Sequence, residues 1–347
     1  LPPQEVFQFR GLPFAGVQVL LGGRAFAFLE CGFALVEVVL HALQPGGNVP
    51  AQAEPRCSLP AAQVINAALC RVGPCSQQHE LLADNVATGT EHYIREHFIK
   101  DDDDFKAAEY LIEHSEFVPR FEMVSEQESL LSDIGYVVPM VPRMPFQQVL
   151  LEYLGEVPLF YALNDSPARV ERLMAVLDNQ LSEILARLAD LPVAYVEFPD
   201  NLHGLMTNPR LFARYSLPGY QRHCETLHRQ RKKVGSHTDG NVKPLMSLLA
   251  ESGLDVCESF SPYPLTPCTF DEAWHAWHGR PIIWGGIPSP ILEERTNQGD
   301  FQEYVRNLLN TVGAGPIILG VGDLVMGHNS IERVRAIAHQ VEAHPIH

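Results

Sequence analysis

Residues 234–262 read VGSHTDGNVKPLMSLLAESGLDVCESFSP and contain two strand patterns joined by a helical one. The first apolar run ends at His237, and a polar turn that includes Asp239 follows it. An apolar helical face then leads to a second apolar run, which ends at Glu258. Because chemistry in parallel sheets gathers at the carboxyl ends of the strands, the histidine and the two acids form a first site hypothesis. A hydrogen-bonded structural role for His237 is the alternative.

The same alternation of strand and helix runs through most of the chain. Strands are expected near residues 136, 193, 234, 255, 281 and 317, each followed by a helix, and two more fit in the N-terminal third. About eight such repeats with parallel buried strands predict an α/β protein, a (β/α)8 TIM barrel. An open doubly wound sheet is the second choice. No GxGxxG or GxxxxGKS/T motif follows any of the strands, which argues against a nucleotide-binding version.

Local signals mark two helices and an apolar N-terminal stretch. The run DDDD at residues 101–104 predicts an N-cap and an acidic first turn, where the helix dipole favours negative charge. A long amphipathic helix is expected to begin near Pro167. Residues 1–43 are apolar, but charged residues interrupt them. A buried strand followed by an amphipathic helix is therefore expected there, not a signal peptide or a membrane span.

The composition excludes several functional classes. The chain has 347 residues, 46% of them hydrophobic, and 42 acidic against 25 basic side chains give a net charge of −17. Such an acidic surface repels phosphate backbones and anionic lipid. We therefore expect neither nucleic acid nor membrane as a partner. The seven cysteines are an odd number without a CxxC pair, and they predict free thiols in a reducing cytoplasm.

In a barrel, the carboxyl ends of all the parallel strands face one mouth. The side chains expected there are Glu197, Asp200, Asn201, His237, Asp239, Glu258, Tyr263, Trp284, Asp323 and His328. A histidine with two or three carboxylates binds a hard or borderline divalent ion, zinc included. Without an ion, the acids would repel one another and one of them would keep a proton, as a general acid does.

Several of these side chains have a structural alternative. Asp200 and Asp323 could be turn residues that accept hydrogen bonds from loop amides or cap a helix. Trp284 and Tyr263 could belong to the core, although pockets are also lined by aromatic side chains. The expected substrate pocket is lined by Glu197, Asn201, Tyr263, Trp284 and His328.

Three segments carry a resemblance to a known family. The stretches HTDGNVKPLMSLLAESGLDVCESFSP, PIIWGGIPSPIL and GPIILGVGDLV resemble the uroporphyrinogen decarboxylase superfamily. The resemblance is closer to the branch of methyltransferases that pass methyl groups to a corrinoid protein, among them the O-demethylase methyltransferases of methoxylated aromatics. It runs from about Glu91 to the C-terminus. This resemblance implies a (β/α)8 barrel, in agreement with the strand count.

The resemblance also implies a ligand set. Metal-binding members of this branch hold zinc with an H-x-C pair and a later cysteine. These three positions correspond to His237, Asp239 and Asp323 in this chain, so carboxylates replace both thiolates. An oxygen-rich site suits an ether or hydroxyl substrate better than a thiol, with the metal optional. The catalytic residues implied are His237, Asp239, Glu258 and Asp200.

The N-terminal region departs from the family. The arginine-rich segment with which the decarboxylase itself holds substrate carboxylates has no counterpart near Arg10. Residues 1–80 also differ from the usual start of the methyltransferase branch. The expected organisation is a divergent N-terminal segment, 1–80, packed on a barrel of residues 81–347.

The expected function is a methyltransferase that takes a methyl group from a small methoxylated substrate, aromatic ones included, or from an otherwise methylated one. Its acceptor would be cobalamin on a separate corrinoid protein, and a homodimer is left open. A decarboxylase-like lyase that uses a carboxylate such as Asp200 to hold a pyrrole is the alternative. A non-catalytic barrel that binds a ligand or a partner subunit is the third candidate.

Overall fold

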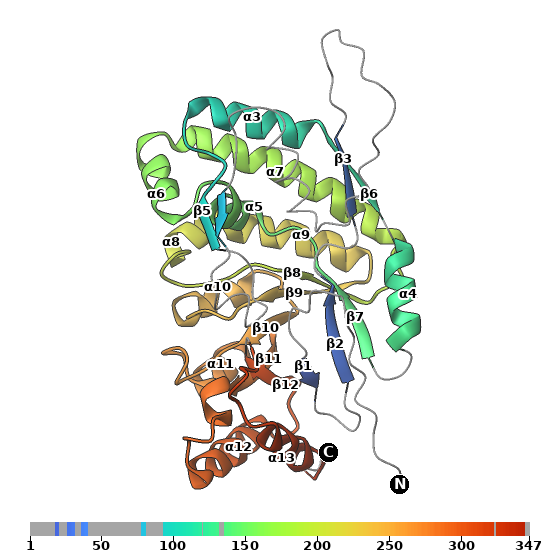
Figure 1. Cartoon of the computed structure of the whole chain (residues 1–347), viewed down its shortest axis with the longest axis vertical. Coiled ribbons are helices and arrows are strands. Elements are labelled where there is room, and N and C mark those ends of the chain that lie inside the picture. The colour runs from blue at the N-terminus through green and yellow to red at the C-terminus, as the bar shows by residue number, and fades with distance from the viewer. Residues whose placement is uncertain are drawn as a thin grey trace.

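The computed structural model describes residues 18–20, 26–31, 36–40, 78–80, 93–119, 121–131, 135–322 and 324–343. Within these ranges the chain forms an α/β fold around a parallel sheet (Figure 1). Asp323, one of the expected metal ligands, lies outside the described residues.

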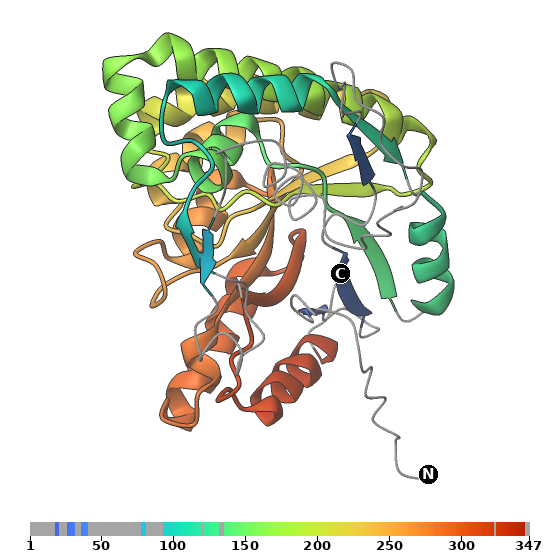
Figure 2. The same cartoon turned by 45° about the horizontal axis from the view of Figure 1, so that its top comes forward.

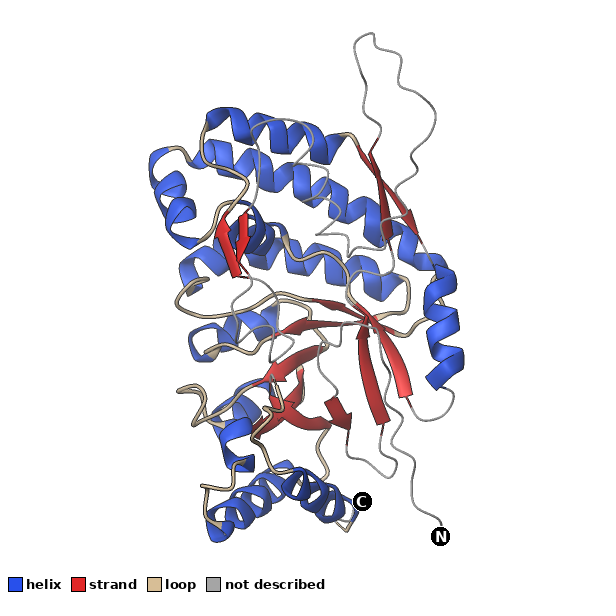
Figure 3. Cartoon of the chain, viewed as in Figure 1, coloured by secondary structure: helices blue, strands red, loops and turns tan. Residues whose placement is uncertain are grey.

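Five consecutive strands make the central sheet, and every neighbouring pair is parallel (Figure 3). They are β8 (Tyr195–Phe198), β9 (Lys233–His237), β10 (Val256–Phe260), β11 (Ile282–Pro288) and β12 (Ile317–Gly322). Their order in the sheet is their order in the chain, and helical segments follow each of them. The strands expected near residues 193, 234, 255, 281 and 317 are therefore confirmed.

The strand expected near residue 136 is β7 (Gly135–Pro139). The segment after it reaches the central sheet through a parallel bridge between Met140 and Glu197, and the Val141 N–H donates to the Glu197 carbonyl at 2.9 Å. On its other side, β7 pairs in parallel with β2 (Phe26–Cys31). β2 in turn pairs antiparallel with β1 (Gln18–Leu20).

The amphipathic helix expected within residues 1–43 is wrong. The described parts of that stretch are β1, β2 and β3 (Val36–Leu40), and β3 pairs antiparallel with β6 (Ser115–Pro119). Phenylalanine and valine are frequent in this region, and aromatic and β-branched residues favour pleated strands. A further antiparallel pair is formed by β4 (Gln78–Glu80) and β5 (Tyr93–Glu96).

Helices cover the outer face of the sheet. They are α3 (Asp102–Glu113), α4 (Phe121–Leu131), α5 (Pro145–Gln148), α6 (Glu156–Asp165), α7 (Pro167–Arg187), α8 (Pro209–Leu211), α9 (Leu217–Arg229), α10 (Met246–Glu251), α11 (Phe270–Trp277), α12 (Gln298–Val312) and α13 (Ile331–Glu342). Shorter helical segments are Val149–Tyr153, Leu188–Asp190, Phe212–Ser216, Lys243–Leu245 and Ser289–Leu292. The long helices α3 and α7 lie side by side (Figure 2).

Both expected helix starts are confirmed. The side chain of Asp101 accepts hydrogen bonds from the backbone N–H groups of Asp103 and Asp104, so it caps α3 and is followed by an acidic first turn. α7 begins at Pro167, whose missing N–H costs nothing at the first helical position. No helix among the described residues combines the length and the apolar character that a membrane span needs.

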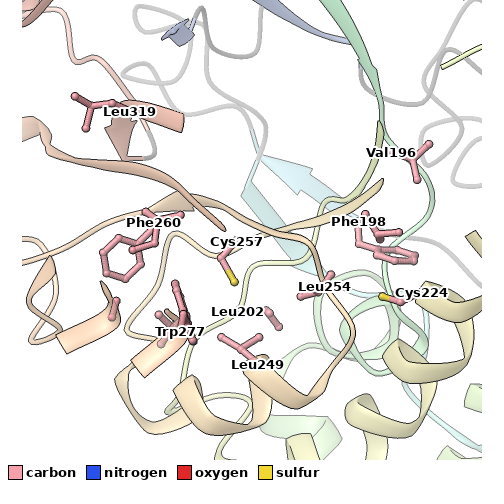
Figure 4. Packing of buried hydrophobic residues seen from close by; sticks show 14 of the residues in the cluster. Val196, Phe198, Leu202, Cys224, Leu249, Leu254, Cys257, Phe260, Trp277 and Leu319 are labelled. Carbon is pink, nitrogen blue, oxygen red and sulfur yellow. The ribbon is translucent and has the colours of Figure 1, made fainter. Parts of the chain in front are cut away.

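The two faces of the sheet carry different side chains. On the helix side, Phe198, Cys257 and Leu319 belong to the main buried core (Figure 4). On the other side, Val138, Val256 and Trp284 form a smaller buried cluster. Side chains alternate along a strand. Because Cys257 faces the helices, Glu258, the next residue, faces the inner side of the sheet. Cys257 and Glu258 therefore point to opposite faces of the sheet.

The parallel sheet of an α/β protein is confirmed. The closure of the strands into an eight-stranded ring and the division of the chain at residue 80 remain predictions. Among the cysteines whose side chains are described, Cys224, Cys257 and Cys268 carry free thiols, as expected.

Candidate functional site

His237 and Glu258 form an ion pair at the ends of two neighbouring strands. They lie opposite each other in the register of β9 and β10, and His237 Nδ1 is 2.6 Å from Glu258 Oε2. The Glu258 side chain is 1% exposed and that of His237 is 19% exposed. The carboxylate is therefore buried, while the imidazole keeps an edge that a ligand can reach. Two of the expected catalytic residues are brought together here.

The loop after β9 is tied to the same point of β10. The carbonyl oxygen of Glu258 accepts hydrogen bonds from the backbone N–H of Thr238 at 2.8 Å and from its Oγ1 at 2.6 Å. Thr238 is itself fully buried. These bonds hold the two strand ends together, so the relative placement of the imidazole and the carboxylate does not depend on their own hydrogen bond alone.

Glu197 is the third member of the group. It lies on β8, opposite Gly235 of β9, and it is 1% exposed. One ligand atom each from Glu197, His237 and Glu258 lie within 4.8 Å of one another. We call these three residues the Glu–His–Glu cluster. Two carboxylates and one imidazole suit a hard or borderline divalent ion, so this set of donor atoms fits the metal that the resemblance implies.

Tyr195 contacts the cluster, although no sequence motif singled it out. Its hydroxyl donates to Glu197 Oε2 at 2.8 Å. Burial, together with the charges of Glu197 and Glu258, raises the pKa of Tyr195 well above its ordinary value, so the phenol remains a donor. The spacing of two residues could have placed Tyr195 and Glu197 on one face of a strand, but it does not reveal that the phenol reaches the carboxylate.

The charges of the cluster control the protonation of His237. Burial alone lowers the pKa of the imidazole, but the charge and the hydrogen bond of Glu258 oppose it, and Asp239 and Glu197 add to their effect. The net result raises the pKa of His237 to about 10. In the ion-free protein the ring therefore carries a proton at neutral pH, and a divalent ion must displace that proton to bind it.

Asp239 lies beside the cluster. Its Oδ1 is 3.8 Å from His237 Nε2, and its side chain is 27% exposed. The expected pairing of His237 with Asp239 is thus close in space, but the buried group of three includes Glu197 and Glu258 in place of Asp239. The third expected ligand, Asp323, lies outside the described residues.

Asp200 is engaged in a buried network. One carboxylate oxygen accepts from the Met144 N–H at 2.9 Å, and the other accepts from the Tyr220 hydroxyl, which also lies 2.9 Å from Ser236 Oγ. The side chain is 0% exposed. Burial raises the pKa of Asp200 to about 6, although these hydrogen bonds and the charge of Arg143 act to lower it. Through these hydrogen bonds, Asp200 links the loop after β7 to α9 and β9. Because it is fully buried, a substrate cannot reach it.

The remaining expected pocket residues are divided between the inner face and the surface. Trp284 is 4% exposed and packs against Tyr195 with 6.0 Å between the ring centroids. Asn201 is exposed, and Tyr263 is 64% exposed in the segment after β10. His328 is 66% exposed, with its Nε2 at 3.4 Å from Glu293 Oε1. Trp284 therefore lies next to the residues that contact the cluster, whereas the other three are surface side chains.

Comparisons with known proteins agree with this geometry at the level of the fold. The family model described as uroporphyrinogen decarboxylase (URO-D) matches residues 158–344, which is more than half of the chain. A methyltransferase from Methanosarcina mazei has a similar structure, with a TM-score of 0.55 and 11% sequence identity. That match covers 81% of this chain and 77% of the other. No curated protein matches the chain in sequence.

Proposed function

Since the chain belongs to the uroporphyrinogen decarboxylase family, we propose that it is a methyltransferase of that family. Its substrate would be a small methoxylated compound, aromatic ones included, or another methylated compound. The acceptor of the methyl group would be cobalamin on a separate corrinoid protein. The similar fold of the methyltransferase from Methanosarcina mazei is compatible with this choice, and the chemistry of the cluster favours it.

The observation that carries the proposal is the Glu–His–Glu cluster. Its ligand atoms lie within 4.8 Å of one another, and its donors are oxygen and nitrogen without a thiolate. We propose that Glu197, His237 and Glu258 hold a divalent ion, zinc included, and that Asp239 and Asp323 are the further ligands to test. Such an ion, when bound, would polarise the oxygen of an ether or a hydroxyl group.

The task of the chain's own residues is to stabilise the oxygen from which the methyl group departs. In the transfer, the bond between the methyl carbon and the substrate oxygen breaks with both electrons left on oxygen, as the acceptor attacks that carbon. The oxygen then needs a proton. If Asp239 does not bind the ion, its position beside His237 with 27% of its side chain exposed would let it pass a proton between solvent and substrate. Trp284 would exclude water from one side of the site.

We further propose that β1, β2 and β7 to β12 form one closed ring of strands. Two contacts support this. The bridge between Met140 and Glu197 joins β7 to β8, and β1 lies near β12. In such a ring the carboxyl ends of β8, β9 and β10 face the same mouth, which is the face that a corrinoid protein must reach.

The experiment that tests the proposal combines metal analysis with a transfer assay. Purified protein is mixed with a reduced corrinoid protein and with methyl ethers, methylamines or methyl thiols in turn, and methyl-cobalt absorbance is followed. We expect transfer from an ether, one bound ion per chain, and the loss of both in His237→Ala. Transfer from none of these donors, or transfer that His237→Ala leaves unchanged, would remove the proposal.

A matched control is available at a second buried histidine. His223 pairs with Asp178 at 2.8 Å between α9 and α7, away from the strand ends, and it is 3% exposed. His223→Ala removes the same atoms from another partly buried histidine–carboxylate contact. We expect it to lower stability while the ion stays bound.

The second candidate function is a metal-independent lyase, which the description of the matching family favours. Its expected carboxylate, Asp200, is 0% exposed, and both of its oxygens accept hydrogen bonds. Because the side chain is fully buried, a pyrrole cannot reach Asp200 in this arrangement, so the lyase remains second. Turnover of uroporphyrinogen by ion-free protein would reverse the order of the two candidates.

A further inference from the structure

We infer that Tyr195 is a positioning residue that directs the carboxylate of Glu197 into the Glu–His–Glu cluster, and that Gly235 is glycine because the phenol occupies the place of a side chain there. This inference rests on the proposed metal centre. It adds that Tyr195 and Gly235, which are not ligands, help to form that centre. Tyr195 acts through Glu197 and does not itself bind the ion.

The first observation is the hydrogen bond within β8. Tyr195 and Glu197 are two residues apart in the strand, so their side chains lie on the same face. The Tyr195 hydroxyl donates to Glu197 Oε2 at 2.8 Å. A carboxylate that is 1% exposed depends on such donors because burial without them is costly. The bond also restrains the orientation of the carboxylate.

The second observation is the space at Gly235. This residue is the register partner of Glu197 on β9 and lies two residues before His237. A Cβ built on Gly235 would lie 1.7 Å from the Tyr195 hydroxyl oxygen and 2.6 Å from its Cζ. The phenol therefore crosses directly over the backbone of Gly235 on its way to Glu197. Any side chain at position 235 would push the hydroxyl away from the carboxylate.

The third observation is how Tyr195 itself is held. Its ring packs at 47° against Trp284 with 6.0 Å between centroids. Its backbone N–H and that of Ala194 donate to the Tyr136 hydroxyl at 3.2 and 2.8 Å. The strand and the ring are thus fixed independently of Glu197, which is what a residue needs if it is to orient a neighbour.

These contacts predict a specific defect when they are broken. Partners that orient a metal ligand typically contribute about 10–100-fold to metal affinity. Tyr195→Phe removes only the hydroxyl, and Gly235→Ala keeps the hydroxyl but displaces it. Because both changes act on the same hydrogen bond, their effects should not multiply. The double variant should bind the ion about as weakly as the weaker single variant.

The experiment measures zinc dissociation constants by competition with a chromophoric chelator for wild type, Tyr195→Phe, Gly235→Ala and the double variant. We expect each single variant to bind about 10–100-fold more weakly, and the double variant to stay within about threefold of the weaker one. Thermal unfolding of the ion-free proteins monitors the fold. Tyr304→Phe is the matched control, since its hydroxyl donates at 2.6 Å to the Gly286 carbonyl, away from the cluster. It should leave zinc affinity unchanged.

The outcomes separate this inference from the proposed function. If wild type binds no zinc, the metal centre is wrong, and the positioning role falls with it. If wild type binds zinc and His237→Ala does not, but Tyr195→Phe binds within about twofold of wild type, only the positioning role is overturned. Multiplied losses in the double variant would overturn the joint action of the two residues. If Gly235→Ala does not fold, Tyr195→Phe and its Tyr304→Phe control still decide the result.

Discussion

Cys257 and Glu258 are neighbours in β10, yet they lie on opposite sides of the sheet. Glu258 meets His237 at 2.6 Å on the inner face, whereas Cys257 is 0% exposed among the core residues that face the helices (Figure 4). Burial raises the pKa of the Cys257 thiol. The thiol is therefore neither a nucleophile nor a ligand, although it is the cysteine closest in sequence to the cluster.

This separation predicts the effect of Cys257→Ser. The new hydroxyl would be buried without a hydrogen-bond partner, so we expect the free energy of unfolding to fall by about 1–3 kcal/mol. Metal content should not change. Urea unfolding and elemental analysis of the same preparation measure both quantities. Loss of the ion in a variant that still folds would mean that the thiolate is a ligand after all.

Removal of the Glu258 charge should weaken the proposed metal centre directly. In Glu258→Gln the side chain keeps its shape but loses its charge and one acceptor oxygen for His237. We expect zinc affinity to fall by more than the roughly 10–100-fold typical of an outer partner, because a proposed ligand loses its negative charge. Competition with a chelator measures the zinc dissociation constant. Glu272→Gln is the control, since Glu272 caps α11 and pairs with Lys243. Equal affinity in Glu258→Gln and wild type would exclude Glu258 as a ligand.

The charge of His237 predicts a pH dependence in the ion-free protein. Its pKa is about 10 in the folded chain against 6.5 for an ordinary histidine, so the folded state binds this proton more tightly than the unfolded state. The resulting stability is fully present below about pH 6.5 and is lost as the pH rises through about 10. Urea unfolding of wild type and His237→Gln from pH 6.5 to 10 isolates this contribution. The difference between the two proteins should shrink steadily, and a constant difference would contradict the prediction.

The raised pKa of Asp200 predicts that stability also depends on pH in a second, more acidic range. Its pKa is raised from 3.8 to about 6, so the folded state prefers the protonated acid. Its favourable contribution is present below about pH 4 and is lost as the pH rises through about 6. Relative to wild type, Asp200→Asn should gain on the order of 3 kcal/mol of unfolding free energy between pH 4 and pH 8. Guanidinium unfolding at both values measures the change.

The role of Asp200 is tested in the same variant. Because its oxygens accept from Met144 and Tyr220, Asp200→Asn should retain zinc affinity and methyl transfer within a few-fold. A selective loss of activity at unchanged stability would return Asp200 to the catalytic residues.

Local patterns were enough to predict much of this protein. Alternating apolar runs and helical faces indicated the six strands from residue 136 onward, because period and turn residues are properties of short segments. The four aspartates before α3 and Pro167 at the start of α7 indicated helix starts for the same reason. The helix predicted within residues 1–43 was wrong, since a short apolar run carries little information on whether it becomes strand or helix until its partner strand is known.

The parallel alternation also indicated that His237, Asp239 and Glu258 lie at one edge of a sheet, because parallel strands end on the same side. What the amino-acid order left open was the composition of the buried group. Glu197 joins it because β8 pairs with β9 in one register, and Tyr195 reaches Glu197 because Gly235 of the neighbouring strand leaves room. Asp200 is drawn into contact with Tyr220 and Met144 instead. Such contacts depend on distances between residues far apart in the chain, which only packing in three dimensions determines.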